Sequence, residues 1–360
     1  MHIALDAQST VGRKTGIGVY TAELLAALQR VAPQHDVTAL RWERDVPMRL
    51  DRRLRWQQVE VPRRAKRARA DLLHIPGFDA PLWKPCPVVL TVHDLIGSLY
   101  PRNLPPVSRF YWSRWLPFTI RSADAIIADS TSTKDDLVRI LGVRAEKITV
   151  VLLGVHERFR PQAEPARAAL RERYQLRQPY LLYVGTLEPR KGIDTLIDSF
   201  AVLAAQYPHD LVIAGKKGWY WETILKRIEH HKLNNRVRVI DYVTDQELPA
   251  LYSAASVFVF PSRYEGFGLP VLEAMACGTP VVCANSSSLP EVAGNGALLV
   301  PPDQPDALTA AIKPILDGAD IAVHLRERGF KRSAELTWER TAYATLRVYT
   351  ETLERRTIHT

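Results

Sequence analysis

Short, unbroken apolar runs recur along the whole chain, separated by segments in which apolar residues follow helical spacing. Runs such as Val88–Val92 and Ala125–Ala128 lack the regular polar and apolar alternation of a strand with one wet face. They are typical of strands buried on both faces of a parallel sheet, and the alternation of strands with helices predicts an α/β fold. The predicted strands cover residues 2–6, 72–75, 88–92, 125–128, 147–153, 180–185, 211–215, 237–242, 257–261 and 281–284.

The length of the chain predicts two domains. A single hydrophobic core stops growing near roughly 250–300 residues, and this chain has 360. Pro161 and Pro165 stand among charged residues without an apolar period, as in an interdomain linker. We therefore expect an N-terminal domain over 1–163 and a C-terminal domain over 164–337. The last helical segment, 338–360, is predicted to pack back onto the N-terminal domain.

Composition narrows the class of protein. Hydrophobic residues make up 46% of the chain and charged residues 24%, as in ordinary folded proteins. No apolar run approaches the ~20 residues that span a bilayer, and the first residues form no export signal, so we expect a cytoplasmic protein. Cys86, Cys277 and Cys283 show neither metal-ligand spacing nor a disulfide framework, and we interpret them as core residues.

Basic residues concentrate in one stretch. The formal net charge is +9, and residues 41–69 hold eleven Arg or Lys against four Asp or Glu, a local excess of 11 − 4 = +7. Such a patch is either a solvated face or a site for anionic lipid, a pyrophosphate-linked acceptor or nucleic acid. Residues 109–118 interleave arginine with aromatic residues, a pattern found in interfacial segments and in helix cores. Peripheral association with the inner face of the cytoplasmic membrane is therefore one of two interpretations of these stretches. Nucleic acid is not an expected partner, because no recognition motif accompanies the patch.

A glycine loop and a short helix follow the ninth predicted strand. Gly266 and Gly268 free the loop, Pro270 suits the first helical position, and Gly278 suits the residue just past the helix end. We expect this helix to begin near Leu269. In an open α/β sheet, ligands bind beyond the carboxyl ends of strands, and the unpaired N–H groups at a helix start favour anions. The loop therefore predicts a diphosphate site.

Two acids flank this predicted site. Glu265 precedes the loop, and Glu273 lies in the first turns of the helix. Both carboxylates can accept hydrogen bonds from sugar and ribose hydroxyls of one ligand. The alternative is that the acids only complement the helix dipole.

A second candidate site follows the strand predicted at 180–185. Arg190 can donate two hydrogen bonds to phosphate oxygens and Lys191 can act as a point charge, so together they can hold a diphosphate and stabilise it as a leaving group. The alternative is a pair of ordinary surface cations. At the next strand end in the same half, Gly215 and Lys216 add a glycine and a cation.

The first half contributes a histidine at the same kind of sheet edge. His93 directly follows the strand predicted at 88–92. A lone histidine is usually structural, but its position at the sheet edge also allows a ligand-binding role. Gly16 and Gly18 partly match the glycine motif of dinucleotide-binding proteins. The third glycine of that motif is missing, and the loop after the first predicted strand is too long for it, which excludes a nicotinamide or flavin dinucleotide site. The chain has no Asp-x-Asp pair, so we expect a metal-independent site in which cations and a helix dipole hold the phosphates.

Over nearly the whole chain, these residues resemble the retaining family-4 glycosyltransferases of the glycosyltransferase-B (GT-B) fold. Residues 265–282 are similar to the family's Glu-x7-Glu motif and its following strand. Residues 185–192 resemble its diphosphate-binding turn, and residues 12–18 its N-terminal glycine loop. His93 resembles the histidine beside the donor sugar. Thr186 is a departure, because many members carry arginine there.

The resemblance implies two Rossmann-like, doubly wound domains that face each other across a cleft. It implies that Glu273 binds the nucleotide ribose, that Glu265 and the loop amides bind the donor sugar and phosphate, and that the cations bind the diphosphate. The implied catalytic residues are His93, Glu265, Lys191 and Arg190; the implied donor-binding residues are Gly16, Gly18, Gly185, Gly215, Lys216, Tyr242, Val243, Gly266, Phe267, Gly268, Leu269 and Glu273, and no metal ligand is implied.

The donor sugar nucleotide is inferred from a similarity to one group of enzymes within this family. The turn at 187–192 and the stretch at 71–76 resemble bacterial mannosyltransferases that build O-antigen or exopolysaccharide. This implies GDP-mannose as donor and a saccharide or lipid-linked saccharide as acceptor. Two alternatives stay open: a family-4 transferase that uses a UDP-linked glucose or N-acetylglucosamine, and a non-catalytic subunit that binds nucleotide sugars.

Overall fold

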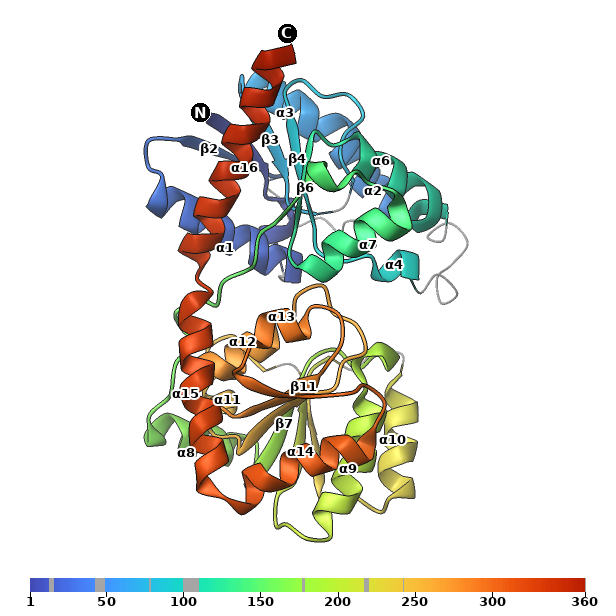
Figure 1. Ribbon diagram of the computed structural model, residues 1–360, viewed down its shortest axis with the longest axis vertical. Coiled ribbons are helices and arrows are strands. Elements are labelled where there is room, and N and C mark those ends of the chain that lie inside the picture. The colour runs from blue at the N-terminus through green and yellow to red at the C-terminus, as the bar shows by residue number, and fades with distance from the viewer. Residues whose placement is uncertain are drawn as a thin grey trace. The chain divides into compact units, whose positions relative to one another are not determined.

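The computed structural model describes residues 1–12, 16–42, 49–77, 79–99, 110–176, 179–216, 220–241 and 243–359. It divides into two α/β units, the first formed by Met1–Gly154 with Trp338–Thr360 and the second by Val155–Thr337 (Figure 1). Each unit contains one six-stranded sheet, and the strand pairs of both sheets are parallel. The predicted α/β class is confirmed.

The sheet of the first unit has the strand order β2-β1-β3-β4-β5-β6. Its central strands are buried along their whole length, which explains why their sequences are continuous apolar runs. The strand predicted at 147–153 is shorter than expected and ends at Val150. The strands are β1 (His2–Asp6), β2 (Asp36–Leu40), β3 (Leu72–Ile75), β4 (Val88–Val92), β5 (Ala125–Ala128) and β6 (Ile148–Val150).

Helices cover this first sheet. Ser130 caps one of them as its sequence predicts, because its hydroxyl accepts the Thr133 backbone N–H at 3.1 Å. The first helix begins at Gly16, and the Thr21 hydroxyl donates to the Ile17 carbonyl one turn earlier at 2.7 Å. The helices are α1 (Gly16–Val31), α2 (Leu50–Arg55), a π-helical turn η2 (Trp56–Glu60), α3 (Val61–Arg67), α4 (Ile96–Leu99), a π-helical turn η4 (Tyr111–Trp115), α6 (Leu116–Ser122) and α7 (Thr131–Leu141), with short 3₁₀ turns at η1 (Gln8–Thr10) and η5 (Ala145–Lys147).

The last helix, α16 (Trp338–His359), belongs to the first unit and runs beside α1 (Figure 1). Thr341 donates its hydroxyl to the Leu152 carbonyl at 2.8 Å, and Tyr349 lies 2.6 Å from Nδ1 of the buried His74 on β3. These contacts fix a helix that follows the second unit in sequence. The predicted return of the final helix to the N-terminal domain is thus part of the fold.

The second unit has the strand order β12-β11-β10-β7-β8-β9. Its chain order reverses between β7 and β10, which lie side by side although β8 and β9 come between them in sequence. Such a reversal leaves a crevice at the carboxyl ends of the two strands. The strands are β7 (Tyr180–Val184), β8 (Asp210–Ala214), β9 (Val237–Ile240), β10 (Val257–Phe260), β11 (Val281–Ala284) and β12 (Ala297–Val300).

The helices of the second unit connect these strands. The helix expected near Leu269 begins there, with Pro270 as its second residue, and Gly278 follows its end with φ 76°. None of the helices in the described part of the chain combines the length and apolar character that a bilayer span needs. The helices are α8 (Glu164–Arg173), a 3₁₀ turn η6 (Pro189–Lys191), α9 (Ile193–Ala204), α10 (Trp221–His230), α11 (Leu248–Ser253), α12 (Leu269–Ala276), α13 (Leu289–Ala293), α14 (Pro305–Asp317) and α15 (Ala319–Glu335).

The boundary between the units lies after Gly154, earlier in the chain than the expected position after residue 163. Val155 forms a parallel bridge with Thr337, and its N–H donates to the Leu336 carbonyl at 3.1 Å. Phe159 is buried, and its ring lies 6.1 Å from that of Tyr252. These contacts tie the start of the proline-containing segment to the second unit.

Candidate functional site

Two of the predicted motifs meet at the strand reversal in the second unit. The turn that carries Arg190 and Lys191 leaves β7, and the loop that carries Glu265 leaves β10. Since β7 and β10 are paired neighbours, their carboxyl ends bring the two motifs to one edge of the sheet. Lys191 and Glu265 therefore lie within hydrogen-bond distance of each other, although more than seventy residues separate them in the sequence.

Gly192 allows the turn and the loop to approach. It adopts φ 65°, and a Cβ atom at this position would lie 2.2 Å from the Pro261 carbonyl oxygen. Such a separation is far inside van der Waals contact, so a side chain would force the two segments apart. The Arg263 N–H donates to the Arg190 carbonyl at 2.7 Å and closes the contact.

Lys191, Arg190 and Glu265 form one charged cluster. The Lys191 ammonium lies 2.6 Å from Glu265 Oε1, and Arg190 Nη1 lies 3.3 Å from Glu265 Oε2. Arg190 also donates to the Tyr264 carbonyl at 3.0 Å and pairs with Glu188 at 3.0 Å. Two cations thus share one buried carboxylate, and Glu188 adds a second negative charge to the cluster.

The protonation state of Glu265 follows from these neighbours. Burial alone would raise the pKa of its carboxyl, but the charges of Lys191 and Arg190 outweigh burial and hold that pKa below its usual value. Glu265 is therefore ionised at neutral pH. Lys191 is only 8% exposed and its ammonium also lies 5.3 Å from the centre of the Phe260 ring, so its position is narrowly defined.

Serine hydroxyls shape the loop between Glu265 and Gly268. The Glu265 N–H donates to Ser287 Oγ at 2.8 Å, while Ser288 Oγ lies 2.7 Å from the Phe267 carbonyl. Gly268 adopts φ 105°, and a Cβ atom there would lie 2.6 Å from a Leu289 methyl group. Gly268 therefore allows the loop to enter α12 in a conformation that a side chain would not permit.

Glu273 has different partners from Glu265. It lies on α12, and Tyr252 on α11 donates its hydroxyl to Glu273 Oε2 at 2.9 Å. Burial raises the pKa of Glu273 to about 7, although the Tyr252 hydrogen bond and the charge of Arg158 act in the opposite direction. This carboxyl therefore changes charge within the physiological range.

Two glycines at neighbouring strand ends stand in close contact. Gly185 follows β7 and Gly215 follows β8, and a Cβ atom at Gly215 would lie 2.0 Å from the Gly185 carbonyl oxygen. The Lys216 carbonyl accepts the Leu187 N–H at 3.3 Å. Val243 is buried beyond β9. The remaining predicted donor residue, Tyr242, lies outside the described residues.

Arg263 is a functional candidate that sequence reasoning missed. Its Nη2 lies 2.8 Å from Asp194 Oδ2 on α9, its Nε lies 2.6 Å from Asp303 Oδ1, and its Nη1 donates to the Pro189 carbonyl. The side chain therefore links the cationic turn to the start of α9. Its position two residues before Glu265 was the only signal in the sequence.

The predicted residues of the first unit form a separate set. His93 directs Nδ1 at Asp129 Oδ2, 2.5 Å away, and Nε2 at the Pro76 carbonyl, 2.9 Å away. Both partners are acceptors, so the ring donates from both nitrogens as an imidazolium. Burial would lower the pKa of His93, but the Asp129 charge and these hydrogen bonds raise it above the usual value.

Gly16 and Gly18 belong to the first turn of α1 rather than to a loop. Gly16 is exposed, and a Cβ atom there would meet no heavy atom within 4 Å. Gly18 is buried. Across the described residues of both units, no three His, Cys, Asp or Glu side chains are grouped as a metal site.

Comparisons with known families cover both units. A family model described as Glycosyltransferase Family 4 matches residues 14–159, and one described as Glycosyl transferases group 1 matches residues 167–332. O-antigen chain mannosyltransferase B of Escherichia coli is 34% identical over 266 residues, which are 72% of this chain and 69% of that protein. The serotype-specific mannosyltransferase WbdA of Escherichia coli is 32% identical over 290 residues, 78% of this chain, but the match spans only 35% of WbdA.

Solved structures share the fold at lower identity. Sucrose-phosphate synthase from Thermosynechococcus elongatus superposes with a TM-score of 0.77 at 22% identity, covering 98% of this chain and 99% of that one. HepE of Anabaena, solved in complex with UDP-glucose, gives a TM-score of 0.76 at 18% identity and covers 98% of this chain and 100% of that one. Both solved structures thus share the fold of this chain.

Proposed function

Because this chain belongs to glycosyltransferase family 4, we propose that it transfers mannose from GDP-mannose to a saccharide or lipid-linked saccharide, with retention of the anomeric configuration. The activity as a glycosyltransferase follows from the family, while the donor and acceptor are the proposal. One observation carries it: Lys191, Arg190 and Glu265 converge beside the glycine loop that opens α12. Relatives named as mannosyltransferases, one of them an O-antigen chain mannosyltransferase, support the choice of sugar and product.

The cationic turn binds the donor diphosphate in this proposal. Lys191 and Arg190 lie together at the sheet edge beside the glycine loop, so a diphosphate bound at this edge would lie beside both cations. The same cations stabilise negative charge on the phosphate oxygen as the sugar leaves. The N–H groups of Gly266, Phe267 and Gly268 and the start of α12 add hydrogen bonds and a favourable dipole.

The two glutamates bind hydroxyl groups. Glu265, ionised and held by two cations, accepts hydrogen bonds from the donor sugar. Glu273, oriented by Tyr252, accepts hydrogen bonds from the nucleotide ribose. The acceptor hydroxyl attacks the anomeric carbon from the face that the diphosphate leaves. A new carbon–oxygen bond forms, the bond to the phosphate oxygen breaks, and that oxygen takes the acceptor proton.

We expect this transfer to need no added divalent metal. Cations and a helix start surround the proposed phosphate site, and the sequence has no Asp-x-Asp pair. Turnover should persist after dialysis against EDTA. Loss of turnover in EDTA, restored by Mg²⁺ or Mn²⁺, would contradict this expectation.

The acceptor proposal includes contact with an anionic membrane. In the first unit, buried Asp79 accepts hydrogen bonds from Tyr111 at 2.6 Å and from Gln58 at 3.0 Å. It thereby ties η2, which lies between the basic helices α2 and α3, to the aromatic segment η4. Phe110, next to η4, is 65% exposed, and Trp83, in the loop between β3 and β4, is 47% exposed. Arg109 and residues 43–48 of the predicted basic and aromatic stretches lie outside the described residues.

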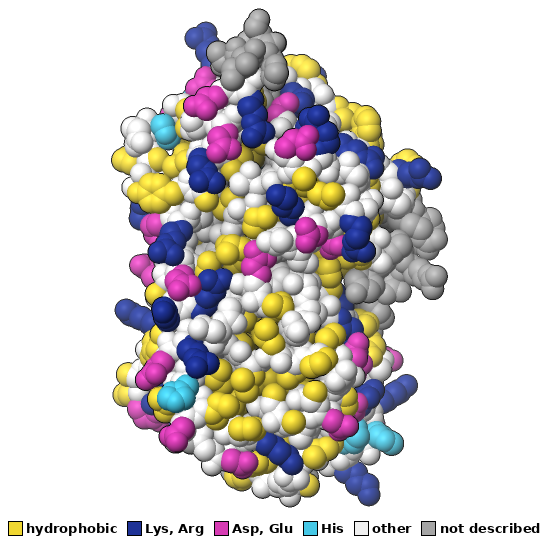
Figure 2. All heavy atoms as spheres, viewed as in Figure 1, with side chains coloured by type: hydrophobic (Ala, Val, Ile, Leu, Met, Phe, Trp, Pro, Cys, Tyr) yellow, Lys and Arg dark blue, Asp and Glu magenta, His cyan; other side chains and the backbone are white. Residues whose placement is uncertain are grey.

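Exposed aromatic rings beside cations suit the boundary between lipid headgroups and acyl chains. The ammonium of Lys66 lies 5.7 Å from the Trp83 ring centre, and Figure 2 shows cationic, acidic and hydrophobic side chains interspersed over the visible face of the first unit. A Trp83→Ala, Phe110→Ala variant should float less with phosphatidylglycerol vesicles than wild type. Tyr343→Ala, which removes an exposed ring on α16, serves as control; equal flotation of all three proteins would contradict membrane contact.

A nucleotide-binding experiment distinguishes the proposed function from two alternatives. A UDP-sugar donor would keep the same phosphate contacts and change only the base and sugar. A non-catalytic nucleotide-sugar subunit would bind donor without turning it over. In a thermal-shift titration without metal, GDP and GDP-mannose should raise the melting temperature more than UDP or ADP compounds. A preference for UDP would replace the donor, and binding without any transfer or hydrolysis would favour the non-catalytic subunit.

A further inference from the structure

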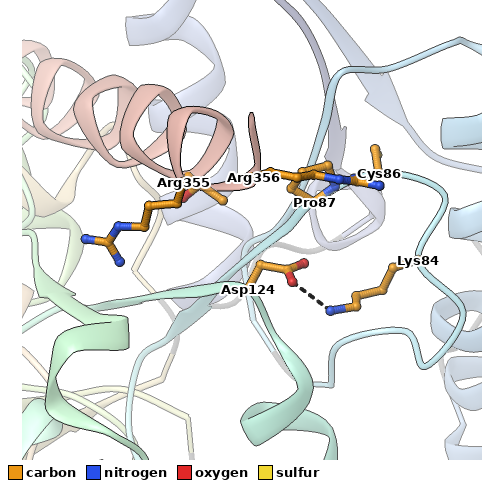
Figure 3. Close-up of a pocket in the computed structure, with 7 residues that line it drawn as sticks. Lys84, Cys86, Pro87, Asp124, Arg355 and Arg356 are labelled. Carbon is orange, nitrogen blue, oxygen red and sulfur yellow. Dashed lines mark hydrogen bonds and ion pairs between the residues drawn. The ribbon is translucent and has the colours of Figure 1, made fainter. Parts of the chain in front are cut away.

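A second cationic pocket lies in the first unit, away from the strand ends that carry His93. It has a volume of 430 Å³ and is lined by Lys84, Cys86, Pro87, Asp124, Thr352, Arg355 and Arg356. Pro87 and Asp124 immediately precede β4 and β5, so the pocket lies at the amino ends of these parallel strands, whereas His93 follows the carboxyl end of β4. The last turns of α16 form its other wall (Figure 3).

The charges of the pocket are unbalanced. Three of its lining residues are cations and one is an acid. That acid, Asp124, is already used: its carboxylate accepts the Val88 N–H at 2.8 Å and pairs with the Lys84 ammonium at 2.8 Å. The pair fixes the start of β4 against the start of β5, and the arginines of α16 add positive charge to the wall opposite it.

Lys147 is a further cation near the pocket. Its ammonium lies 3.0 Å from the Ala123 carbonyl. Its pKa is lowered first by partial burial and then by the positive charge of Arg144; Lys84 adds to this effect, while Asp124 and Glu146 oppose it.

The floor of the pocket is uncharged. Cys86 is buried, and burial raises the pKa of its thiol to about 11, so the thiol stays protonated at neutral pH. Figure 3 shows Arg356 reaching toward Cys86 and Pro87, while Arg355 extends from the same turn of α16 in the other direction. The volume is within the range of about 300–1,000 Å³ that small-ligand sites occupy.

We propose that this pocket is an anion site for a phosphate ester, held by Arg356 and Lys84 with Arg355 at the rim. The shared chemistry is a phosphate group that carries one or two negative charges; it is supplied by a soluble sugar phosphate or by an acidic lipid headgroup. Guanidinium groups bind such oxygens with two parallel hydrogen bonds. A bound phosphate would join the end of α16 to the starts of β4 and β5.

The test compares three proteins: wild type, an Arg355→Gln, Arg356→Gln double variant, and an Arg347→Gln control. Arg347 lies on the same helix, is 74% exposed, and faces Glu351 rather than the pocket. Calorimetric titration with inorganic pyrophosphate counts the sites in each protein. The double variant should bind one equivalent fewer than wild type, or bind it at least about tenfold more weakly, which corresponds to the loss of about 1.4 kcal/mol. The Arg347 control should match wild type.

The readouts separate this site from the donor site. If the donor site also binds pyrophosphate, wild type binds two equivalents and the double variant one; if it does not, the numbers are one and none. Glycosyl transfer should be unchanged in the double variant, because neither arginine belongs to the proposed donor site. Identical isotherms for wild type and the double variant, with equal melting temperatures without ligand, would overturn the proposal.

A second measurement identifies the source of the phosphate. Flotation with phosphatidylglycerol vesicles should fall in the double variant if the site takes a lipid headgroup. Flotation equal to wild type, together with the lost pyrophosphate site, assigns the pocket to a soluble phosphate ester.

Discussion

The Lys191 ammonium lies 2.6 Å from Glu265 Oε1, and the two side chains are 9% and 10% exposed. A buried pair of this kind is costly to break from one side, because the remaining charge has no solvent to compensate it. The pair therefore combines a structural contact with the charge that the proposed donor diphosphate requires. Variants can separate the two roles.

Lys191→Ala should lower both stability and turnover. The loss of a buried partner predicts a decrease of about 3 kcal/mol in the free energy of unfolding, moderated by Arg190 on the other carboxylate oxygen. Turnover should fall by about 100-fold, the usual effect of removing a group that stabilises developing charge. Urea unfolding and transfer assays measure the two effects.

A double variant, Lys191→Ala with Glu265→Ala, provides the decisive comparison. It should regain part of the lost stability, because no unpaired carboxylate remains, but none of the lost turnover. Lys331→Ala, on an exposed position of α15, controls for simple loss of a positive charge. Recovery of turnover in the double variant would remove Glu265 from the donor site and leave the pair a purely structural role.

Arg263→Lys should impair transfer without unfolding the protein. The guanidinium contacts Asp194, Asp303 and the Pro189 carbonyl together, and an ammonium cannot reproduce these directions. We expect the KM for the donor to rise by about tenfold, corresponding to about 1.4 kcal/mol of positioning free energy. Arg326→Lys is the matched control, because that guanidinium also donates to a backbone carbonyl, Gly278, on the surface. An unchanged KM would show that the turn holds its position without Arg263.

The buried strands of both sheets were predictable because burial on two faces leaves a continuous apolar run. The edge strands β2 and β12 were not predicted. β2 (Asp36–Leu40) is mostly half-buried or exposed, and Asp36 and Thr38 interrupt its apolar residues. β12 (Ala297–Val300) is an apolar run, so its sequence does show the pattern of a strand and was overlooked. The other two edge strands, β6 and β9, were predicted.

The candidate site was predictable in part. Glycines, acids and cations at strand ends identify the turn and the loop, because ligands of α/β sheets bind there. The supporting residues were not predictable: Tyr252 reaches Glu273 from another helix, and Ser287 reaches the Glu265 N–H from the segment after β11. Their roles depend on which strands are neighbours, and the chain order alone does not state that β7 lies beside β10.

Glu273 predicts a pH dependence of donor binding. Burial raises the pKa of its carboxyl to about 7, so the ionised form that accepts two ribose hydrogen bonds becomes dominant only above neutrality. The KM for the sugar nucleotide should therefore fall by about tenfold between pH 6 and pH 8, as expected for binding that requires a group with that pKa to be ionised.

Glu273→Gln is the control for this dependence. The amide cannot titrate, so this variant should bind the donor more weakly and with little change between pH 6 and pH 8. A sugar nucleotide is the suitable ligand, because its diphosphate lacks the terminal ionisation of a free nucleoside diphosphate. A wild-type KM that is flat over this range would exclude the ionised Glu273 carboxylate from donor binding.

His93 and Asp129 predict a pH dependence of stability in the first unit. The folded state raises the pKa of His93 above its unfolded value of about 6.5. The pair should therefore contribute its full stabilisation below about pH 6.5 and lose it as the pH rises through the folded pKa, because only the folded state retains the proton in that interval. The difference in unfolding free energy between wild type and His93→Gln, measured in urea, should shrink from pH 6 to pH 9. His324→Gln, on an exposed part of α15, should show no such trend. A difference that grows with pH would mean that His93 is neutral in the folded protein, and the imidazolium deduced from its two acceptor partners would then be wrong.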